Sequence, residues 1–212
     1  MAKGRYAVKE IYYSLQGEGD RTGRPAVFCR FAGCNLWSGH EVDREDAICN
    51  FCDTEFVGTN GPGGGEFDSA ESLASAIEAT FPEREWLPYV VFTGGEPLLQ
   101  LDPPLIRACR ERDIEVAIET NGTIPAPEGV DWICVSPKPN SNWVQRTGQE
   151  LKIIFPTSLS LEGLCELPFD HFFLQPMDGP DLKRNTELTI AYCRSHEPWQ
   201  ISLQTHKLMG IP

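Results

Sequence analysis

The chain has 212 residues, 41% of them hydrophobic and 23% charged, and this size and composition fit one soluble globular domain with a sizeable core. Its formal net charge of −13 argues against a nucleic-acid-binding surface, because phosphate binding needs clustered lysine and arginine, and the longest basic cluster is Lys183-Arg184. No apolar run approaches the roughly 18 to 20 residues of a membrane span, so we expect no membrane partner.

The N-terminus leads directly into a strand-like segment. Residues 1–5 carry no signal-peptide pattern, which predicts a cytoplasmic protein. Thiols stay reduced in the cytoplasm, so clustered cysteines there indicate a metal site more often than a disulfide. Five of the eight cysteines stand singly in apolar patterns and are expected to be inert core residues: Cys29, Cys109, Cys134, Cys165 and Cys193.

Apolar runs rich in β-branched residues recur along the chain and predict strands. They cover residues 27–31, 89–92, 115–118, 132–135, 151–155, 172–174 and 200–203. Several of these runs are apolar at consecutive positions, as the strands of a buried parallel sheet are.

A helical pattern follows the first of these runs. Asp68 is expected to cap this helix, because Glu71 stands three residues later, as in a capping box. Leu73, Ile77 and Phe81 then recur at helical spacing and predict its buried face.

Two further helices are expected, one beginning at Asp102-Pro103 and one spanning about residues 181–196. The connections at 119–131 and 136–150 carry several prolines and glycines, so neither can hold a full crossover helix. The alternation of strands and helices predicts an α/β fold with a largely parallel sheet. The missing helices predict a partial, incompletely helix-clad (β/α) barrel.

Polar clusters stand at the carboxyl ends of six of the predicted strands. In chain order they are Cys34, Thr93-Gly94-Gly95-Glu96-Pro97, Glu119-Thr120-Asn121-Gly122, Ser136-Pro137-Lys138, Gln175-Pro176-Met177-Asp178 and Gln204-Thr205-His206-Lys207. Any one of them could be an ordinary turn. Together they converge on one face, where barrel enzymes keep their active sites, and we therefore predict an enzyme.

Three cysteines form the most informative pattern: Cys34, Cys49 and Cys52 fall within nineteen positions. A four-iron cluster held by three thiolates keeps one iron open for chemistry, whereas structural zinc needs four ligands. His40 lies between the first two cysteines and could supply a fourth zinc ligand. From spacing alone, a zinc-stabilised binding module and unrelated buried thiols therefore stay open as alternatives.

The three cysteines, together with Gly94-Gly95-Glu96-Pro97, resemble the radical S-adenosylmethionine enzymes. The fourteen residues between Cys34 and Cys49 exceed the usual spacing of that superfamily. A closer resemblance is carried by this insert, the segment 14–19 (Ser-Leu-Gln-Gly-Glu-Gly) and residues 204–207 near the C-terminus. With these features, nearly the whole chain resembles the 7-carboxy-7-deazaguanine synthase family. A radical-generating activase for a partner protein would share the cysteines and a short barrel, but it would lack this segment and need an open groove for a peptide.

The resemblance implies a carbon–nitrogen lyase reaction on the route to queuosine and other 7-deazapurines. 6-Carboxy-5,6,7,8-tetrahydropterin would contract to 7-carboxy-7-deazaguanine with loss of ammonia. An electron from a [4Fe-4S] cluster to S-adenosylmethionine would give a 5′-deoxyadenosyl radical, which takes hydrogen from C6 of the pterin and later returns it, so that the cofactor is catalytic. The resemblance also implies Mg2+, an electron donor such as a flavodoxin, a homodimer, and one domain (1–212) with a cluster-loop insert at 35–48 and a C-terminal tail that closes on the active site.

The resemblance assigns site residues position by position, and no catalytic side chain, since the cluster and S-adenosylmethionine carry the chemistry. The metal ligands are Cys34, Cys49 and Cys52 for iron and Thr54 for magnesium. The cofactor positions are Phe51, Cys52, Asp53, Gly94, Gly95, Glu119, Asn121, Ser136, Pro137, Lys138, Gln175, Pro176, Met177 and Asp178. The substrate positions are Leu15, Gln16, Gly17, Glu18, Arg30, Thr93, His206 and Pro212.

Several of these assignments suit the chemistry. Gly94 and Gly95 would let the backbone approach the methionine moiety without a clash. Arg30 offers a planar fork for a carboxylate, its alternative being a surface ion pair. A threonine hydroxyl with a substrate carboxylate and waters suits magnesium, a hard cation.

Overall fold

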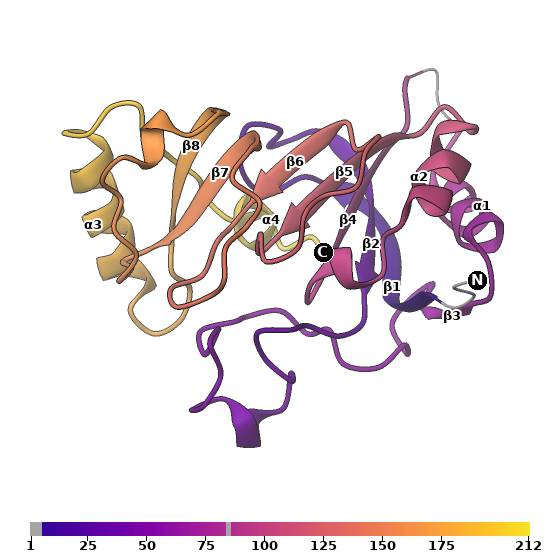
Figure 1. Cartoon of the computed structure of the whole chain (residues 1–212), viewed down its shortest axis with the longest axis horizontal. Helices are drawn as coiled ribbons and strands as arrows, with labels where there is room; N and C mark the ends of the chain where they lie inside the picture. Colours follow the sequence, from indigo (N-terminus) through magenta and orange to yellow (C-terminus); the bar gives the residue numbers. More distant parts are fainter. Residues whose placement is uncertain (1–5, 84–85) are drawn as a thin grey trace.

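The computed structural model describes residues 6–83 and 86–212; residues 1–5, on which the expectation about a signal peptide rests, lie outside them. The described strands form one nine-stranded sheet in the order β3-β1-β2-β4-β5-β6-β7-β8-β9 (Figure 1). Their bounds are β1 Tyr6–Leu15, β2 Pro25–Phe31, β3 Gly65–Phe67, β4 Tyr89–Gly94, β5 Glu115–Thr120, β6 Trp132–Val135, β7 Gly148–Phe155, β8 Phe169–Pro176 and β9 Gln200–Ile201.

All neighbouring strands from β2 to β9 pair in parallel, whereas β1 pairs antiparallel with β2 and β3. The sheet has two free ends, β3 and β9, and so does not close. This confirms the predicted α/β fold with a partial barrel. All seven predicted strands are present, but β7 begins at Gly148, so Glu150 belongs to a strand and not to the preceding connection.

The helices are α1 Ala70–Thr80, α2 Pro103–Arg110, α3 Leu182–Cys193 and α4 Thr205–Met209, with 3-10 turns η1 Glu41–Asp43, η2 Pro97–Leu99 and η3 Leu164–Glu166. In Figure 1, α1 and α2 cover one part of the sheet and α3 covers the other end. No described helix lies between β5 and β6 or between β6 and β7, as the prolines and glycines predicted. None of the described helices has the length and hydrophobicity that a membrane crossing requires.

The start of α1 differs from the prediction by one residue. Ser69, not Asp68, is the N-cap: its side chain accepts a hydrogen bond from the Ser72 backbone, and the Ser72 hydroxyl accepts one from the Ser69 backbone. Two serines thus complete a reciprocal capping box without the expected glutamate. The start of α2 is as predicted, because the Asp102 carboxylate accepts from the Leu105 backbone at 3.2 Å.

The two faces of the sheet bury different side chains. On the outer face, β4 contributes Val90 and Phe92 to the core beneath α1 and α2. On the inner face, Tyr89 and Val91 pack with other residues from β2 and β5. This alternation follows from the two-residue period of a strand, so the inward side chains of each strand fill the barrel.

Three of the five single cysteines are core residues as predicted: Cys29, Cys109 and Cys134 are buried. Cys165 and Cys193 are only half-buried, so the prediction is wrong for these two. Both side chains pack against the edge of the core beneath α3, and Cys193 is the last residue of that helix.

Charged residues close the barrel interior at the amino ends of the strands. Glu115 is the first residue of β5, and it forms ion pairs with Arg21 and Arg24 from the β1–β2 connection. The Arg21 guanidinium lies 3.9 Å from the centre of the Trp132 ring, and that of Arg24 lies 3.9 Å from the centre of the Tyr89 ring. These contacts form a floor, which leaves the carboxyl ends of the strands for a ligand.

Candidate active site

A cavity of about 410 Å³ opens at the carboxyl ends of the strands, where the polar clusters predicted it. Every predicted site residue except Pro137 lines this cavity. Pro137 is buried between Ser136 and Lys138, which both reach the cavity. The structure therefore brings the predicted metal, cofactor and substrate positions together around one space.

Cys34, Cys49 and Cys52 lie on one wall of the cavity as free thiols. The Cys49 thiol donates to the sulfur of Cys52, which lowers the pKa of Cys52 to about 6, and burial raises the pKa of Cys34. Among residues 6–83 and 86–212, no three His, Cys, Asp or Glu side chains surround one point as the ligands of a single ion do. Each thiolate of a four-iron cluster binds a different iron, and the three thiols line the same cavity.

The insert 35–48 folds back against the cysteine wall. Arg44 donates to the backbone oxygens of Asn50 at 2.9 Å and Cys52 at 3.0 Å. Its guanidinium also stacks 4.0 Å from the centre of the Trp37 ring. His40, the alternative zinc ligand, does not line the cavity.

The glycines after β4 are required by close backbone packing. A Cβ on Gly94 would overlap the backbone oxygen of Phe31, and one on Gly95 would overlap that of Gly33 and lie 2.6 Å from the Cβ of Cys34. The sequence predicted that these glycines make room for a bound methionine moiety. In the described structure, close packing already demands both, since a side chain on Gly94 would meet the backbone of Phe31 in β2 and one on Gly95 would meet the loop that carries Cys34.

Glu96 joins this loop to the neighbouring strand end. Its fully buried carboxylate accepts hydrogen bonds from the backbones of Leu98 and Asn121, at 3.0 and 2.8 Å, and from the Thr120 hydroxyl at 2.8 Å. Its own backbone N–H donates to the Gly33 oxygen at 3.0 Å. Burial raises the pKa of Glu96. One side chain thus ties the ends of β4 and β5 to the cysteine loop.

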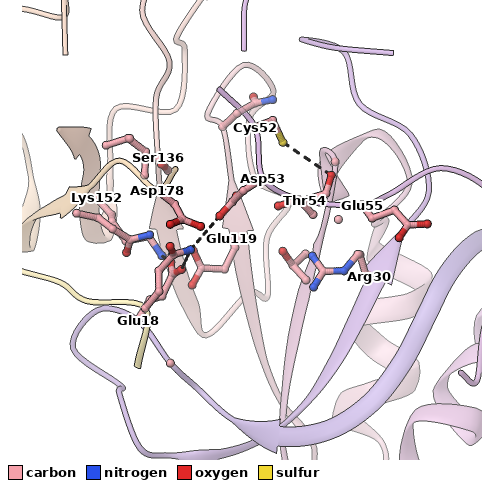
Figure 2. A pocket seen from close by; sticks show the side chains of 18 of the residues that line it. Glu18, Arg30, Cys52, Asp53, Thr54, Glu55, Glu119, Ser136, Lys152 and Asp178 are labelled. Atoms are coloured by element: carbon pink, nitrogen blue, oxygen red, sulfur yellow. Dashed lines mark hydrogen bonds and ion pairs between the residues drawn. The ribbon is translucent and has the colours of Figure 1, made fainter. Parts of the chain in front are cut away.

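On the opposite wall, Lys152 lies between two carboxylates (Figure 2). Its Nζ donates to Glu18 at 2.6 Å and to Glu119 at 2.8 Å, and only 4% of the lysine side chain is exposed. Burial opposes ionisation of both Lys152 and Glu18, but attraction to the surrounding anionic groups, Glu119 and Glu18 among them, raises the pKa of Lys152, and attraction to Lys152 lowers the pKa of Glu18. Gln16 and Gln204 donate to the remaining oxygens of Glu119 and Glu18.

Arg30 reaches the cavity from β2. Its Nε donates to Glu10 at 2.7 Å and one terminal nitrogen donates to the Tyr12 hydroxyl at 3.1 Å. The ion pair that the sequence left as an alternative is therefore present, although its partners line the cavity as well. Burial opposes the charge of Arg30, but Tyr12 and Glu10 raise its pKa overall.

Helix α4 completes one side of the cavity. The backbone N–H and hydroxyl of Thr205 both donate to the Gly17 oxygen at 2.9 Å. Lys207 bridges Asp53 and Asp178, with both Nζ–oxygen distances 2.6 Å. The Ser14 hydroxyl donates to the Pro212 oxygen at 2.7 Å, which holds the residues after α4 against β1.

Comparisons with known proteins place the chain in a family. A sequence model of the Radical SAM superfamily matches residues 46–136. The chain is 57% identical over 208 residues to a 7-carboxy-7-deazaguanine synthase from Caulobacter vibrioides and, over the same length, to one from Bordetella pertussis, covering 98% of this chain and 99% of each relative. The chain belongs to the 7-carboxy-7-deazaguanine synthase family.

The structure agrees with this membership. The crystal structure of QueE from Escherichia coli superposes with a TM-score of 0.67 at 26% identity, over 94% of this chain and 93% of that one. A radical S-adenosylmethionine enzyme uses a [4Fe-4S] cluster and S-adenosylmethionine, and the three-cysteine wall fits such a cluster. The superfamily match begins at residue 46 and so includes Cys49 and Cys52 but not Cys34, which the expanded insert separates from them.

Some residues of the site were missed from the sequence. Lys152 stands inside an apolar run, and Glu10 and Tyr12 lie on β1, which the sequence showed only as strand-like. A lysine at the centre of a buried strand was the one available signal, because a buried cation needs carboxylate partners. Glu119, for which a cofactor contact was predicted, lines the cavity and accepts hydrogen bonds from Gln16 and Lys152.

Proposed function

We propose that this protein is a 7-carboxy-7-deazaguanine synthase, which contracts the ring of 6-carboxy-5,6,7,8-tetrahydropterin to 7-carboxy-7-deazaguanine with loss of ammonia. The observation that carries the proposal is the single cavity with three thiols on one wall and the Lys152–Glu18–Glu119 group and Arg30 on the others. When bound, the cluster and S-adenosylmethionine supply a radical that removes and returns the hydrogen at C6. The protein's own residues bind and orient the substrate for this step.

The wall with Cys34, Cys49 and Cys52 would hold three irons and leave the fourth for the cofactor. The cofactor would also contact the strand-end residues predicted above, from Gly94 and Gly95 to Asp178. Because Glu96 ties the β4 end to the Cys34 loop, the cofactor and cluster positions are held at a fixed separation. Such rigidity favours a reaction that depends on the alignment of the reacting atoms.

The opposite wall suits a carboxypterin. Arg30 supplies a planar donor group for the substrate carboxylate. Glu18 and Glu119 supply acceptors for ring and amino N–H groups, and Lys152 holds both carboxylates in place by ion pairs. Gln16, Thr93 and His206 complete the hydrogen-bonding groups predicted for the pterin, and α4 lies along this side of the cavity.

Magnesium would bind between Thr54 and the substrate carboxylate. Thr54 lines the cavity beside the cysteine wall, and its neighbour Asp53 is already paired with Lys207. Since one hydroxyl is a weak ligand, the ion would be held fully only with substrate present.

We expect Thr54→Ala to reduce the stimulation of turnover by Mg2+, measured as the ratio of rates with and without the ion. An unchanged ratio would remove Thr54 from the magnesium site.

The remaining features of the proposal follow from the family resemblance. The enzyme would be a cytoplasmic carbon–nitrogen lyase and a homodimer, reduced by an electron donor such as a flavodoxin. Residues 1–212 would form one domain, with the insert 35–48 against the cluster and the C-terminal tail closing over the bound substrate. The contacts of Thr205, Lys207 and Pro212 with the rest of the chain support this role for the tail.

The test is anaerobic incubation of the reconstituted enzyme with the carboxypterin, S-adenosylmethionine and a reductant. Mass analysis should show 7-carboxy-7-deazaguanine and ammonia, with many product molecules formed for each S-adenosylmethionine consumed. Cys34→Ala serves as the inactive control. The proposal fails if enzyme with an intact cluster leaves the pterin unchanged. It also fails if one molecule of S-adenosylmethionine is consumed for each molecule of product formed.

A further inference from the structure

Glu150 lies one layer beneath the cavity, on the strand that carries Lys152. Alternate residues of β7 face inward, and both Lys152 and Ile154 line the cavity. Glu150 precedes them on the same face but does not reach the cavity, and only 3% of the residue is exposed. A carboxyl group in this position is costly unless its oxygens accept hydrogen bonds.

Both oxygens of Glu150 do accept hydrogen bonds. The indole N–H of Trp132 donates to one oxygen at 2.6 Å. The backbone N–H of Asp20 donates to the other at 3.3 Å. Asp20 belongs to the turn of residues 17–20, named here the Glu18 turn, which carries Glu18 into the cavity. Glu150 therefore connects the barrel interior to this turn.

The Glu18 turn fits closely onto this carboxylate. Gly19 has a φ of +68°, and a Cβ on it would overlap the Glu150 oxygen that accepts from Asp20. The Gly19 backbone donates to the Ser202 hydroxyl at 2.9 Å, and that hydroxyl donates to Gln175 at 3.0 Å. Glycine is thus required at position 19 both by its conformation and by the approach of Glu150.

We propose that Glu150 is a positioning residue for the substrate: by seating the Glu18 turn it places the Glu18 carboxylate on Lys152, where it faces the pterin. The proposal rests on the proposed function and names the residue that sets the geometry of its substrate wall. Glu150 does not touch the cysteine wall, so it acts on substrate binding and not on S-adenosylmethionine binding.

The charge of Glu150 is coupled to the same wall. Burial, followed by repulsion from Glu119, raises its pKa to about 7. The titratable groups that face it from the surrounding elements are Glu119 on β5, Cys134 on β6, Lys152 on β7, His171 on β8 and Asp20 in the Glu18 turn. Ionisation of Glu150 therefore adds a negative charge beside Lys152 and Glu119 near neutral pH, whereas a glutamine would keep the acceptor oxygen without the charge.

The experiment compares the cluster-loaded enzyme with Glu150→Gln and Glu150→Ala, and with Glu162→Gln as a control that removes an exposed carboxylate. Equilibrium binding of the carboxypterin is measured with S-adenosylmethionine present and no reductant, so that no turnover occurs. We expect Glu150→Ala to weaken pterin binding by about tenfold, because the turn loses a hydrogen-bonded anchor, while the dissociation constant of S-adenosylmethionine stays unchanged. Amide hydrogen exchange in residues 17–20 should accelerate in the same variant.

Glu150→Gln should restore slow exchange and parent-like pterin binding at pH 6. Between pH 6 and 8 the parent's pterin affinity should change, whereas that of Glu150→Gln should stay flat and Glu162→Gln should follow the parent. If Glu150→Ala does not fold, the comparison of pterin affinity against pH tests the proposal by itself. The proposal is overturned if the affinity of Glu150→Gln changes with pH as that of the parent does.

Parent-like exchange and pterin affinity in Glu150→Ala would overturn the proposal, as would an equal loss of pterin and S-adenosylmethionine binding. If the parent enzyme does not convert the carboxypterin, the proposed function fails. If the parent is active and the alanine variant binds as the parent does, only the role of Glu150 fails.

Discussion

At the scale of single residues, the site is made of charged side chains that are each paired with a neighbour of opposite charge. Glu18 and Glu119 share Lys152, and Arg30 pairs with Glu10. A buried charge without such a partner would be destabilising by several kcal/mol. These pairs therefore keep donors and acceptors in defined positions before a ligand arrives.

The cysteine wall gives the first prediction. Replacing Cys34, Cys49 or Cys52 by alanine should abolish cluster binding and turnover, because each thiolate holds a different iron. His40→Ala should leave the cluster intact, since His40 does not line the cavity. Iron content and visible absorption after reconstitution measure both effects. Loss of iron in the His40 variant would contradict the three-thiolate assignment.

The second prediction concerns Arg30. A hydrogen bond to a charged group contributes roughly 1.5–3 kcal/mol, and lysine would keep the charge but lose the planar pair of donors. Arg30→Lys should therefore weaken substrate binding by about tenfold or more, retain S-adenosylmethionine binding, and increase uncoupled formation of 5′-deoxyadenosine.

The control for Arg30 uses ligand chemistry. Parent and variant are compared for binding of the pterin with and without its carboxylate. If the variant prefers the carboxylated ligand as strongly as the parent does, Arg30 does not bind the carboxylate, and its contact with Glu10 is then purely structural.

At the scale of elements, the position of the site followed from local patterns. Hydrophobic runs and the turn residues after them are encoded by neighbouring positions, so the strand ends and their polar clusters were predictable. Lys152 and Glu150 were not, because their roles depend on Glu18, Glu119 and Trp132, which other strands bring to them. β3 was missed because it has only three residues and exists through pairing with β1.

Helix α4 gives the third prediction. Five residues are too few for a stable isolated helix, so its position depends on tertiary contacts. Lys207, which bridges Asp53 and Asp178, supplies two of them. We expect Lys207→Met to accelerate hydrogen exchange in residues 204–212 and to raise the KM for the pterin severalfold, with little change in melting temperature, because the lysine is partly exposed and such ion pairs contribute about 1 kcal/mol or less.

Lys183→Met is the matched control for Lys207, because it removes an exposed lysine from α3. Unchanged exchange in Lys207→Met would mean that the Thr205 and Ser14 contacts suffice to hold α4 and the residues after it.

At the scale of the whole molecule, the barrel interior is filled in layers. The ion pairs of Glu115 with Arg21 and Arg24 form the floor of the barrel interior. Trp132 and Glu150 form the next layer, and the group around Lys152 forms a wall of the cavity above them. Residues that carry charge are thus placed in an interior that most small barrels fill with apolar side chains. As a consequence, the free energy of unfolding depends on whether the buried Glu150 is protonated.

Glu150 makes this dependence measurable and gives the last prediction. Burial raises its pKa from 4.5 to about 7 in the folded protein, so between these values the folded state retains a proton that the unfolded state has lost. The free energy of unfolding therefore falls as pH rises from about 4.5 to 7, by about 3 kcal/mol for this group if the full shift is realised. Glu150→Gln removes the titration and keeps an acceptor for Trp132. The melting temperature of Glu150→Gln minus that of the parent should rise steadily between pH 5 and 7 and then stay level to pH 8. If this difference does not vary with pH, Glu150 is ionised in the folded protein throughout this range.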